Sequence, residues 1–355
     1  MNNINVSLGI LDPLYSLFSW FTRIFYEFFG NYGVAIIVLT IFIRALLIPL
    51  NVKSQKSMIK MQALSGKTAE LQRKYGHDKQ RYQQELVKMQ QENGAVSLSG
   101  CILPILQILF IWPIYRIVSG PLHYICQVPK ANIQAMIANG QAHFDLAKTV
   151  TDINHIGLID KLNQNSEFLR QSVNDGLIHA KDLIDLKFLG MDLGKTPTWN
   201  PVTIIKEPGL YVPLLIIPIL VVATSIISMR LTNVLKPGYK EMKEARKREK
   251  LNAARAGQTP KDQSETTMKV MTWMMPAIML YTTFILPAAM GLYWVIGGFM
   301  GILTQIIVYF MFTKPYELKK KEMEEKKKLV FMKKAQAADD SESDNKKKKN
   351  KGNKK

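Results

Sequence analysis

The chain has 355 residues, of which 47% are hydrophobic, and carries a formal net charge of +19. Its Lys and Arg residues are not gathered on one soluble face, as in nucleic-acid-binding proteins, but lie in segments that alternate with long apolar runs. This pattern disfavours a soluble nucleic-acid-binding protein, although the basic C-terminal end can still contact RNA. The two cysteines, Cys101 and Cys126, stand near opposite ends of one apolar run, and we expect no disulfide between them.

The first segment, 1–32, is aromatic-rich and is expected to lie outside the membrane. Residues 14–29 hold Arg23 and Glu27 four positions apart, which favours a helix lying in the outer membrane interface. A sixth membrane span here is the alternative. The start of the chain lacks a basic region and a lipoprotein-type cysteine, so we expect an uncleaved N-terminus on the outer side.

Five apolar runs follow, and each is long enough to cross a bilayer as a helix, which takes roughly 17 to 25 residues. They cover 33–50, 101–118, 209–229, 270–286 and 288–312, with a turn near Pro287 between the last two. The sequence therefore predicts an all-α polytopic membrane protein with five transmembrane helices.

The charges between these runs predict the orientation. The segments 51–100, 230–269 and 313–355 carry net charges of +5, +6 and +8, whereas 119–208 carries −1. Positively charged segments stay in the cytoplasm. We expect an outer N-terminus, an extracytoplasmic loop at 119–208, a cytoplasmic loop at 230–269 and a basic, disordered cytoplasmic tail at 313–355.

The first cytoplasmic segment, 51–100, is predicted to be a helical hairpin. Gly76 can end one helix and Asp78 can cap the next. An apolar, methionine-rich stripe runs along both helices and is suited to varied apolar partners; it contains Met58, Met61, Leu64, Tyr82, Leu86 and Met89. The alternative is that the two helices bury these side chains against each other.

The long outer loop should contain short amphipathic helices at 133–136, 158–162 and 177–186. Its four histidines, His123, His143, His155 and His179, lack the spacing of metal ligands. We expect them at the surface, and we expect no metal site.

Arg44 lies inside the first apolar run and is the main functional candidate. An arginine at the centre of a span costs roughly 2.5 to 3.5 kcal/mol on insertion scales. Its side chain either snorkels to the polar end of the helix or faces the interior of the protein. No run contains Asp, Glu or His, so Arg44 has no counter-ion within the spans, and a carrier driven by intramembrane carboxylates is disfavoured.

The polar side chains available to Arg44 are few. Thr40 lies one turn before it on the same face, and an amide such as Gln107 or Gln305 cannot easily satisfy itself. The remaining candidates are Thr224, Ser225, Ser228, Thr282, Thr283, Tyr293 and Thr304. Each hydroxyl can instead bond its own helix backbone. Gly297 and Gly301 give a GxxxG spacing that favours close packing of the fifth helix.

These runs, in this order, resemble the YidC-type membrane protein insertases of bacteria, which have relatives in mitochondria and chloroplasts. The resemblance is carried by GNYGVAIIVLTIFIRALLIPL with Arg44, the hairpin, GCILPILQILFIWPIYRI, FLGMDLGK and MMPAIMLYTTFILPAAMGLYWVIGG. The outer loop is longer than in many relatives, and we expect neither the lipoprotein signal nor the large periplasmic domain found in some members.

The resemblance implies a bacterial plasma-membrane protein whose five helices surround a hydrophilic groove that is open to the cytoplasm and to lipid. Arg44 would lie in this groove near Thr40 and Gln107, with Tyr293 or Trp294 at its upper wall. The hairpin would contact substrates early. The implied partners are nascent membrane proteins, the lipid bilayer, the ribosome through the tail and cytoplasmic loops, and the Sec translocon.

The predicted function is therefore insertion and chaperoning of small membrane proteins, without enzymatic catalysis and without a cofactor. No nucleotide-binding loop or catalytic constellation occurs in the sequence. Two other functions stay open: an anion carrier that binds its substrate through Arg44, and a ribosome-tethering scaffold that acts through the tail.

Overall fold

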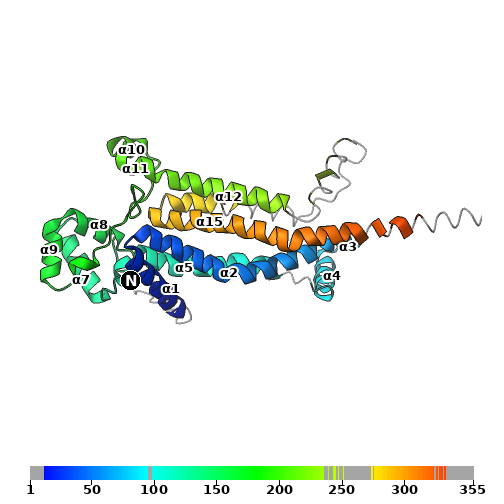
Figure 1. The fold of residues 1–355 in the computed structure, drawn as a ribbon, viewed down its shortest axis with the longest axis horizontal. Helices are drawn as coiled ribbons and strands as arrows, with labels where there is room; N and C mark the ends of the chain where they lie inside the picture. The colour runs from blue at the N-terminus through cyan, green and yellow to red at the C-terminus, as the bar shows by residue number, and fades with distance from the viewer. Residues whose placement is uncertain are drawn as a thin grey trace, which may run out of the picture.

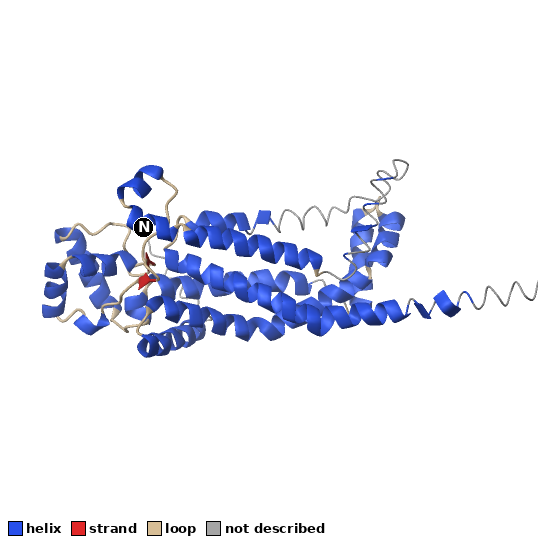
Figure 2. Cartoon of the chain, turned by 45° about the horizontal axis from the view of Figure 1, so that its top comes forward, coloured by secondary structure: helices blue, strands red, loops and turns tan. Residues whose placement is uncertain are grey.

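The computed structural model describes residues 12–94, 98–235 and 276–323, with single positions or pairs at 239, 243–244, 247, 251, 273–274, 325–326, 328–330 and 332. Long helices lie side by side along the long axis of the molecule (Figures 1 and 2). They are α2 (Tyr32–Ala63), α5 (Leu98–Ser119), α12 (Ile216–Val234) and α15 (Ala288–Val308), whereas α1 (Asp12–Phe29) runs obliquely to them near one end (Figure 1). A five-residue π-helix, η3 (Tyr309–Thr313), continues α15.

In this part of the chain, three helical segments are long and apolar enough to cross a membrane: Tyr32–Ser54, Pro208–Val234 and the segment that begins at Ala288. The second predicted run lies in α5, whose described apolar part is Leu109–Ser119. The fourth contains a helix at 276–283, while most of 270–275 lies outside the described residues. The prediction of an all-α polytopic membrane protein is confirmed.

The helices of the bundle pack through apolar faces, which is what their composition dictates. α15 lies against both α2 and α12, and α1 lies against α2 and α5. Phe21 of α1 stacks on Phe42 of α2 with ring centroids 3.8 Å apart. The first helix is therefore attached to the bundle by aromatic contacts, and Arg23 and Glu27 form an ion pair along it at 3.8 Å.

Residues 120–200 form a small domain between α5 and α10, which we call the connecting domain. It contains α6 (Pro121–Tyr124), α7 (Lys130–His143), α8 (Ile156–Gln164), α9 (Ser166–Asn174) and a hairpin of β1 (Lys187–Phe188) and β2 (Met191–Asp192). The short helices α10 (Pro201–Lys206) and α11 (Pro208–Leu214) lead from it into α12. The domain occupies one end of the bundle, opposite the helices α3 (Ser65–Tyr75) and α4 (Lys79–Glu92) (Figure 1).

The helices predicted at 133–136 and 158–162 are confirmed as parts of α7 and α8, but the one predicted at 177–186 is wrong. That segment has only a single 3-10 turn, Ala180–Asp182, before it extends into β1. Of its buried residues Ile178, Ile184 and Leu186, the last two are two positions apart, which is the spacing of extended chain and not of a helix. The helix α9 was not predicted, although Asn165 caps it and Phe168 is fully buried.

The β-hairpin attaches the connecting domain to the bundle. Its two-residue turn, Leu189-Gly190, has φ of 50° and 78°, the left-handed pair that such turns require. The ring of Phe188 lies directly against Gly33, where a Cβ atom would overlap it. The hairpin therefore fits against the first turn of α2 only because residue 33 has no side chain.

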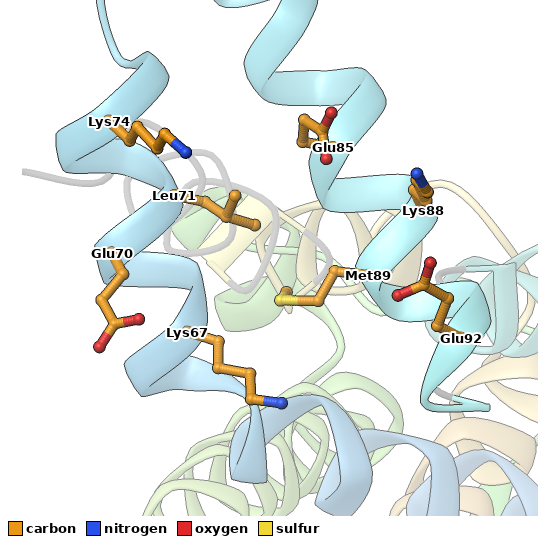
Figure 3. A pocket seen from close by; sticks show the side chains of 8 residues that line it. All are labelled: Lys67, Glu70, Leu71, Lys74, Glu85, Lys88, Met89 and Glu92. Atoms are coloured by element: carbon orange, nitrogen blue, oxygen red, sulfur yellow. The ribbon is translucent and has the colours of Figure 1, made fainter.

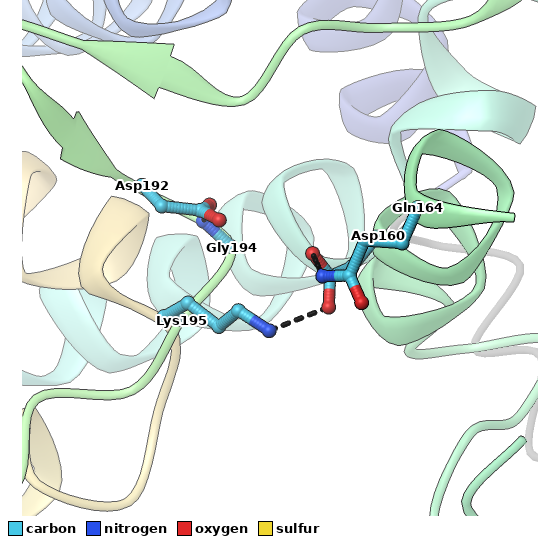
Figure 4. Close-up of polar contacts among 5 residues, drawn as sticks. All are labelled: Asp160, Gln164, Asp192, Gly194 and Lys195. Carbon is cyan, nitrogen blue, oxygen red and sulfur yellow. Dashed lines mark hydrogen bonds and ion pairs between the residues drawn. The ribbon is translucent and has the colours of Figure 1, made fainter. Parts of the chain in front are cut away.

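Backbone hydrogen bonds fix the start of α15 to the same domain. The N–H groups of Ala288 and Ala289 donate to the carbonyls of Lys195 and Leu193 at 2.8 and 3.0 Å. These are N–H groups that a helix start cannot satisfy internally. Lys195 also forms an ion pair with Asp160 of α8 (Figure 4). The connecting domain thus sets the position of α15 relative to α8.

The expectation that all four loop histidines lie at the surface is wrong for His155. Its side chain is fully buried just before α8, and Nδ1 lies 3.2 Å from the carbonyl oxygen of Asp152. Burial lowers its pKa from the usual 6.5 to about 4. The backbone N–H of His155 donates to the carbonyl of Ser119, so this residue joins the domain to the end of α5.

Candidate functional site

Arg44 lies near the middle of α2, and its guanidinium faces α15. A Cβ atom placed on Gly297 would lie 2.6 Å from Nη2 and 3.1 Å from Nε of Arg44. The side chain therefore lies directly on the backbone of α15, at a place that only glycine leaves free. Tyr293, one turn earlier on the same face of α15, is close enough to interact electrostatically with this cation.

A second face of α15 binds α12. Gly291, Gly298 and Gln305 are seven residues apart and so share one side of the helix. A Cβ on Gly291 would overlap Ile217, and a Cβ on Gly298 would lie 2.9 Å from Oγ1 of Thr224. The close approach of α15 to α12 therefore uses Gly291 and Gly298, whereas Gly297, one of the predicted pair Gly297 and Gly301, lies against Arg44 of α2.

Gly301 differs from Gly297 in its surroundings. Among the described residues, no atom lies within 4 Å of the position that its Cβ would take. The face of α15 that carries Tyr293 and Gly297 thus loses its close contacts one turn beyond Arg44, on the side away from the connecting domain.

Three of the shielded polar atoms that lack a partner among the described residues lie on α2 and α15. Within the described residues, Nε of Arg44, Nε1 of Trp294 and Oε1 of Gln305 are shielded from solvent but have no hydrogen-bond partner. Buried polar groups are normally paired, so each of these atoms is free to bind water or a polar group of a ligand. Tyr293 and Trp294 themselves are 2% and 7% exposed.

Most of the candidate hydroxyls are satisfied within their own helices. Thr40 is fully buried and donates to the carbonyl of Ile36 at 2.7 Å. The same pattern, with donation to the preceding turn, holds for Thr224, Thr282, Thr283 and Thr304. The hydroxyl groups of these threonines therefore donate to carbonyls of their own helices and not to groups beside Arg44.

Gln305 makes a contact between helices. Its Nε2 donates to Oγ of Ser228 in α12 at 2.8 Å, and this pair continues the line of contact begun by Gly291 and Gly298. Gln305 therefore joins α15 to α12 through its amide N–H. The side chain of Gln107 lies outside the described residues.

The hairpin predicted at 51–100 consists of the end of α2, α3 and α4. Asp78 caps α4, because its Oδ1 accepts from the backbone N–H of Gln80 and Arg81 at 3.1 and 3.0 Å. Gly76 follows α3 with φ of −61°, so the turn does not use a left-handed glycine. The guanidinium of Arg81 lies 5.3 Å from the ring centroid of Tyr75, which joins the two helices near the turn.

A cavity of about 400 Å³ lies between α3 and α4 (Figure 3). Leu71 and Met89 supply its apolar part, and charged side chains of both signs surround them: Lys67, Glu70, Lys74, Glu85, Lys88 and Glu92. The two helices thus do not fully cover each other's apolar stripe.

The predicted hairpin residues are placed as follows. Leu64 is buried, whereas Tyr82, Leu86 and Met89 are half-buried. The side chains of Met58 and Met61 lie outside the described residues. Of the described members, only Met89 lines the cavity.

No group of three or more potential metal ligands occurs in the described part of the chain. The lone described cysteine, Cys126, is partly buried and donates its thiol to the carbonyl of Asp182 at 3.2 Å. Burial raises the pKa of this thiol to about 12, which keeps it protonated at neutral pH.

Sequence comparisons identify relatives of this chain. Segments of the chain are similar to proteins called membrane protein insertase YidC, with 39% identity over 117 residues in Treponema pallidum and 44% over 92 residues in Helicobacter pylori. A third, from Caldanaerobacter subterraneus subsp. tengcongensis, is 39% identical over 90 residues.

These matched segments cover 33%, 26% and 25% of this chain and 19%, 17% and 44% of the respective relatives. They therefore span less than half of each relative's length. A family model described as 60Kd inner membrane protein matches residues 24–315, from within α1 to the start of the basic tail. The chain belongs to the 60Kd inner membrane protein family.

Proposed function

We propose that this protein is a membrane protein insertase and chaperone, in which Arg44 receives the short polar tail of a nascent membrane protein. The observation that carries the proposal is the position of the guanidinium. It lies inside the span Tyr32–Ser54, against Gly297, and its Nε has no partner among the described residues. The family and the insertase names of the similar proteins support the same function.

The unpaired atoms suit a site that binds polar groups transiently. A carboxylate in the incoming tail that comes within 4 Å of Arg44 would gain about 4 kcal/mol at an effective dielectric constant near 20. Water held by Trp294, Gln305 and Arg44 would shorten the apolar distance that the tail must cross. The groove would run along α15 from Gly297 toward Gly301, with Thr40, Gln107, Tyr293 and Trp294 near Arg44.

Release of the substrate needs no nucleotide. When the hydrophobic helix that follows the tail moves sideways into lipid, each Å² of apolar surface removed from water contributes about 25 cal/mol. This transfer would drive insertion, and the protein would lower the barrier for the tail rather than consume a fuel. In this mechanism the protein is not an enzyme and needs no cofactor.

The charge pattern supports a bacterial plasma-membrane protein with the connecting domain outside and the hairpin and tail in the cytoplasm. In this orientation the hairpin, including Leu64, Tyr82, Leu86 and Met89, meets the substrate before Arg44 does. The cavity between α3 and α4 offers apolar and charged contacts for that first encounter. The ribosome would bind the basic tail and loops, and the Sec translocon would be a partner for some clients.

The test is an insertion assay in proteoliposomes with purified protein and substrates whose translocated tails are acidic or neutral. Arg44→Ala and Arg44→Glu should slow insertion of the acidic tail far more than that of the neutral tail, and Arg44→Lys should retain part of the activity. Arg23→Gln is the matched control, since Arg23 is a cation on α1 paired with Glu27. Equal insertion of acidic tails by Arg44→Glu and the unaltered protein would contradict charge pairing.

The same vesicles distinguish the insertase from an anion carrier. A carrier would take up a labelled small anion in an Arg44-dependent manner, whereas the insertase would not. Deleting residues 314–355 separates the third possibility, because a ribosome tether would lose all function while Arg44→Ala would leave it intact.

A further inference from the structure

The last residues of the connecting domain and α10, which together precede the span that starts at Pro208, carry large apolar side chains on their surface. Trp199 is 81% exposed, and Val202 and Ile205 of α10 are 60% and 77% exposed. In residues 120–198, all of which the structure describes, the exposed large apolar side chains are Ile153 and Leu189. The connecting domain therefore hides its apolar side chains well, and the exposure is concentrated at its junction with the membrane helix.

The place of α10 in the chain limits its distance from the bilayer. Only Glu207 separates α10 from Pro208, where the 27-residue apolar segment Pro208–Val234 begins. At about 1.5 Å per residue such a segment is about 40 Å long, whereas the hydrocarbon core is about 30 Å thick. The segment is divided at Leu215, and its second helix α12, with 19 residues, is by itself about 28 Å long, which matches the core; α11 and α10 therefore lie at the depth of the lipid headgroups.

Trp199 provides a second measure of depth. Its ring stacks on that of Phe284, with centroids 6.2 Å apart and an angle of 26° between the rings. Phe284 belongs to the turn that precedes α15, so Trp199 lies level with the ends of two membrane helices. Tryptophan is enriched at this level of a bilayer because its ring is apolar while its N–H is polar.

The polar residues of the segment fit the same position. Lys206 is exposed in the last turn of α10, beside the exposed Val202 and Ile205. An ammonium group beside apolar side chains matches a lipid surface, where phosphate lies directly above the acyl chains. In Figure 1, α10 and α11 lie to one side of the bundle axis, away from the main body of the connecting domain.

We propose that Trp199 and α10 form an interfacial lipid anchor, in which Val202 and Ile205 enter the boundary between headgroups and acyl chains and Lys206 binds lipid phosphate. The anchor fixes the depth of the outer end of α12 and, through Phe284, that of the turn before α15. It depends on the membrane-spanning fold and not on insertase activity.

The test places an environment-sensitive fluorophore at Ile205→Cys, in the full chain with Cys101→Ser and Cys126→Ser, reconstituted in vesicles of phosphatidylcholine and phosphatidylglycerol. Because Ile205 is exposed, the substitution leaves the core intact. Ala138→Cys, at an exposed position on α7, is the matched control. The anchor predicts blue-shifted emission at 205, strong quenching by lipids spin-labelled near the headgroup, and little quenching by iodide, with the opposite pattern at 138.

Two results would overturn the proposal. Iodide quenching at 205 equal to that at 138 would place α10 in water. Protection at 205 from both iodide and spin-labelled lipid would mean that protein, such as a second copy of the chain, covers this surface. As a second measurement, Val202→Ser with Ile205→Ser should speed proteolysis at Glu207 in vesicles but not in detergent; unchanged proteolysis in vesicles would also contradict the anchor.

Discussion

Gly297→Ala tests whether the position of the Arg44 guanidinium matters, without altering any charge. The new Cβ would lie 2.6 Å from Nη2 of Arg44, whereas non-bonded heavy atoms prefer about 3.5 to 4.0 Å. The neighbour is the end of a flexible side chain, so the guanidinium can move away by about 1 Å while the helices keep their packing. Alanine is also favoured over glycine in a helix by about 1 kcal/mol, so we expect no loss of folding stability.

The expected functional effect follows from Coulomb's law. A unit charge pair gains about 4.2 kcal/mol at 4 Å and about 3.3 kcal/mol at 5 Å when the effective dielectric constant is about 20. The difference of about 0.8 kcal/mol corresponds to roughly a four-fold slower insertion of substrates with one acidic residue in the tail, since about 1.4 kcal/mol is a factor of ten. Neutral-tailed substrates should be affected much less.

Gly301→Ala is the matched control, because it makes the same chemical change one turn away on the same helix. Its Cβ meets no described atom within 4 Å, so it should preserve insertion of both substrates. Insertion rates in proteoliposomes and thermal unfolding in detergent would be measured for both variants. If Gly297→Ala inserts acidic tails as fast as Gly301→Ala does, the position of the guanidinium is not important and our reasoning fails.

Three further predictions concern stability. Burial holds the pKa of His155 near 4, whereas the pKa of this histidine in the unfolded chain is near 6.5, so between these pH values only the unfolded state binds the extra proton. The contribution of His155 to folding stability is therefore complete above pH 6.5 and should fall by about 3 kcal/mol toward pH 4. His155→Gln should lose this pH dependence when the unfolding free energy is measured against pH. Gln305→Leu removes the hydrogen bond to Ser228 and should lower the unfolding free energy by about 0.6 to 1.7 kcal/mol in detergent titrations, with Gln305→Glu failing to restore it. Asp78→Ala removes the cap of α4 and should cost about 0.5 to 2 kcal/mol locally, seen as faster amide hydrogen exchange in α4 but not in α2, whereas Asp78→Asn should keep slow exchange.

The parts of the fold with strong local signals could be predicted from the sequence. Apolar runs of span length, the cap at Asp78 and the turn near Pro287 each depend on a few neighbouring residues, and local physics decides them. The secondary structure of the segment 177–186 is harder to predict, because its apolar residues roughly fit a helical pattern and an extended pattern as well. Contacts with the rest of the connecting domain decide between the two, and the local sequence does not encode them.

The candidate site divides in the same way. The sequence identifies Arg44 as a cation without a counter-ion in the spans, and the four-residue spacing of Tyr293 and Gly297 places both on one face of α15. Which glycines face which helix depends on the rotation of α15 about its axis, and that rotation follows from packing against α2 and α12 together. The GxxxG spacing thus indicated close packing correctly at Gly297, which lies against Arg44 of α2, but not at Gly301, and it did not indicate that Gly291 and Gly298 contact α12.

Two costly features meet at one point in this protein. An arginine within a span is unfavourable by roughly 2.5 to 3.5 kcal/mol, and a glycine in the interior of a helix is unfavourable by about 1 kcal/mol relative to alanine. Each would be easy to replace if stability alone mattered, since leucine at 44 and alanine at 297 would fill the same space with apolar atoms. Gly297 leaves room for the guanidinium of Arg44 to lie on α15, while Nε has no hydrogen-bond partner in the part of the chain that the structure describes. A structure that makes room for a partly buried cation within a span, and that places no counter-ion beside it among the described residues, is suited to an anionic group that arrives and leaves, which is what insertion of an acidic tail requires.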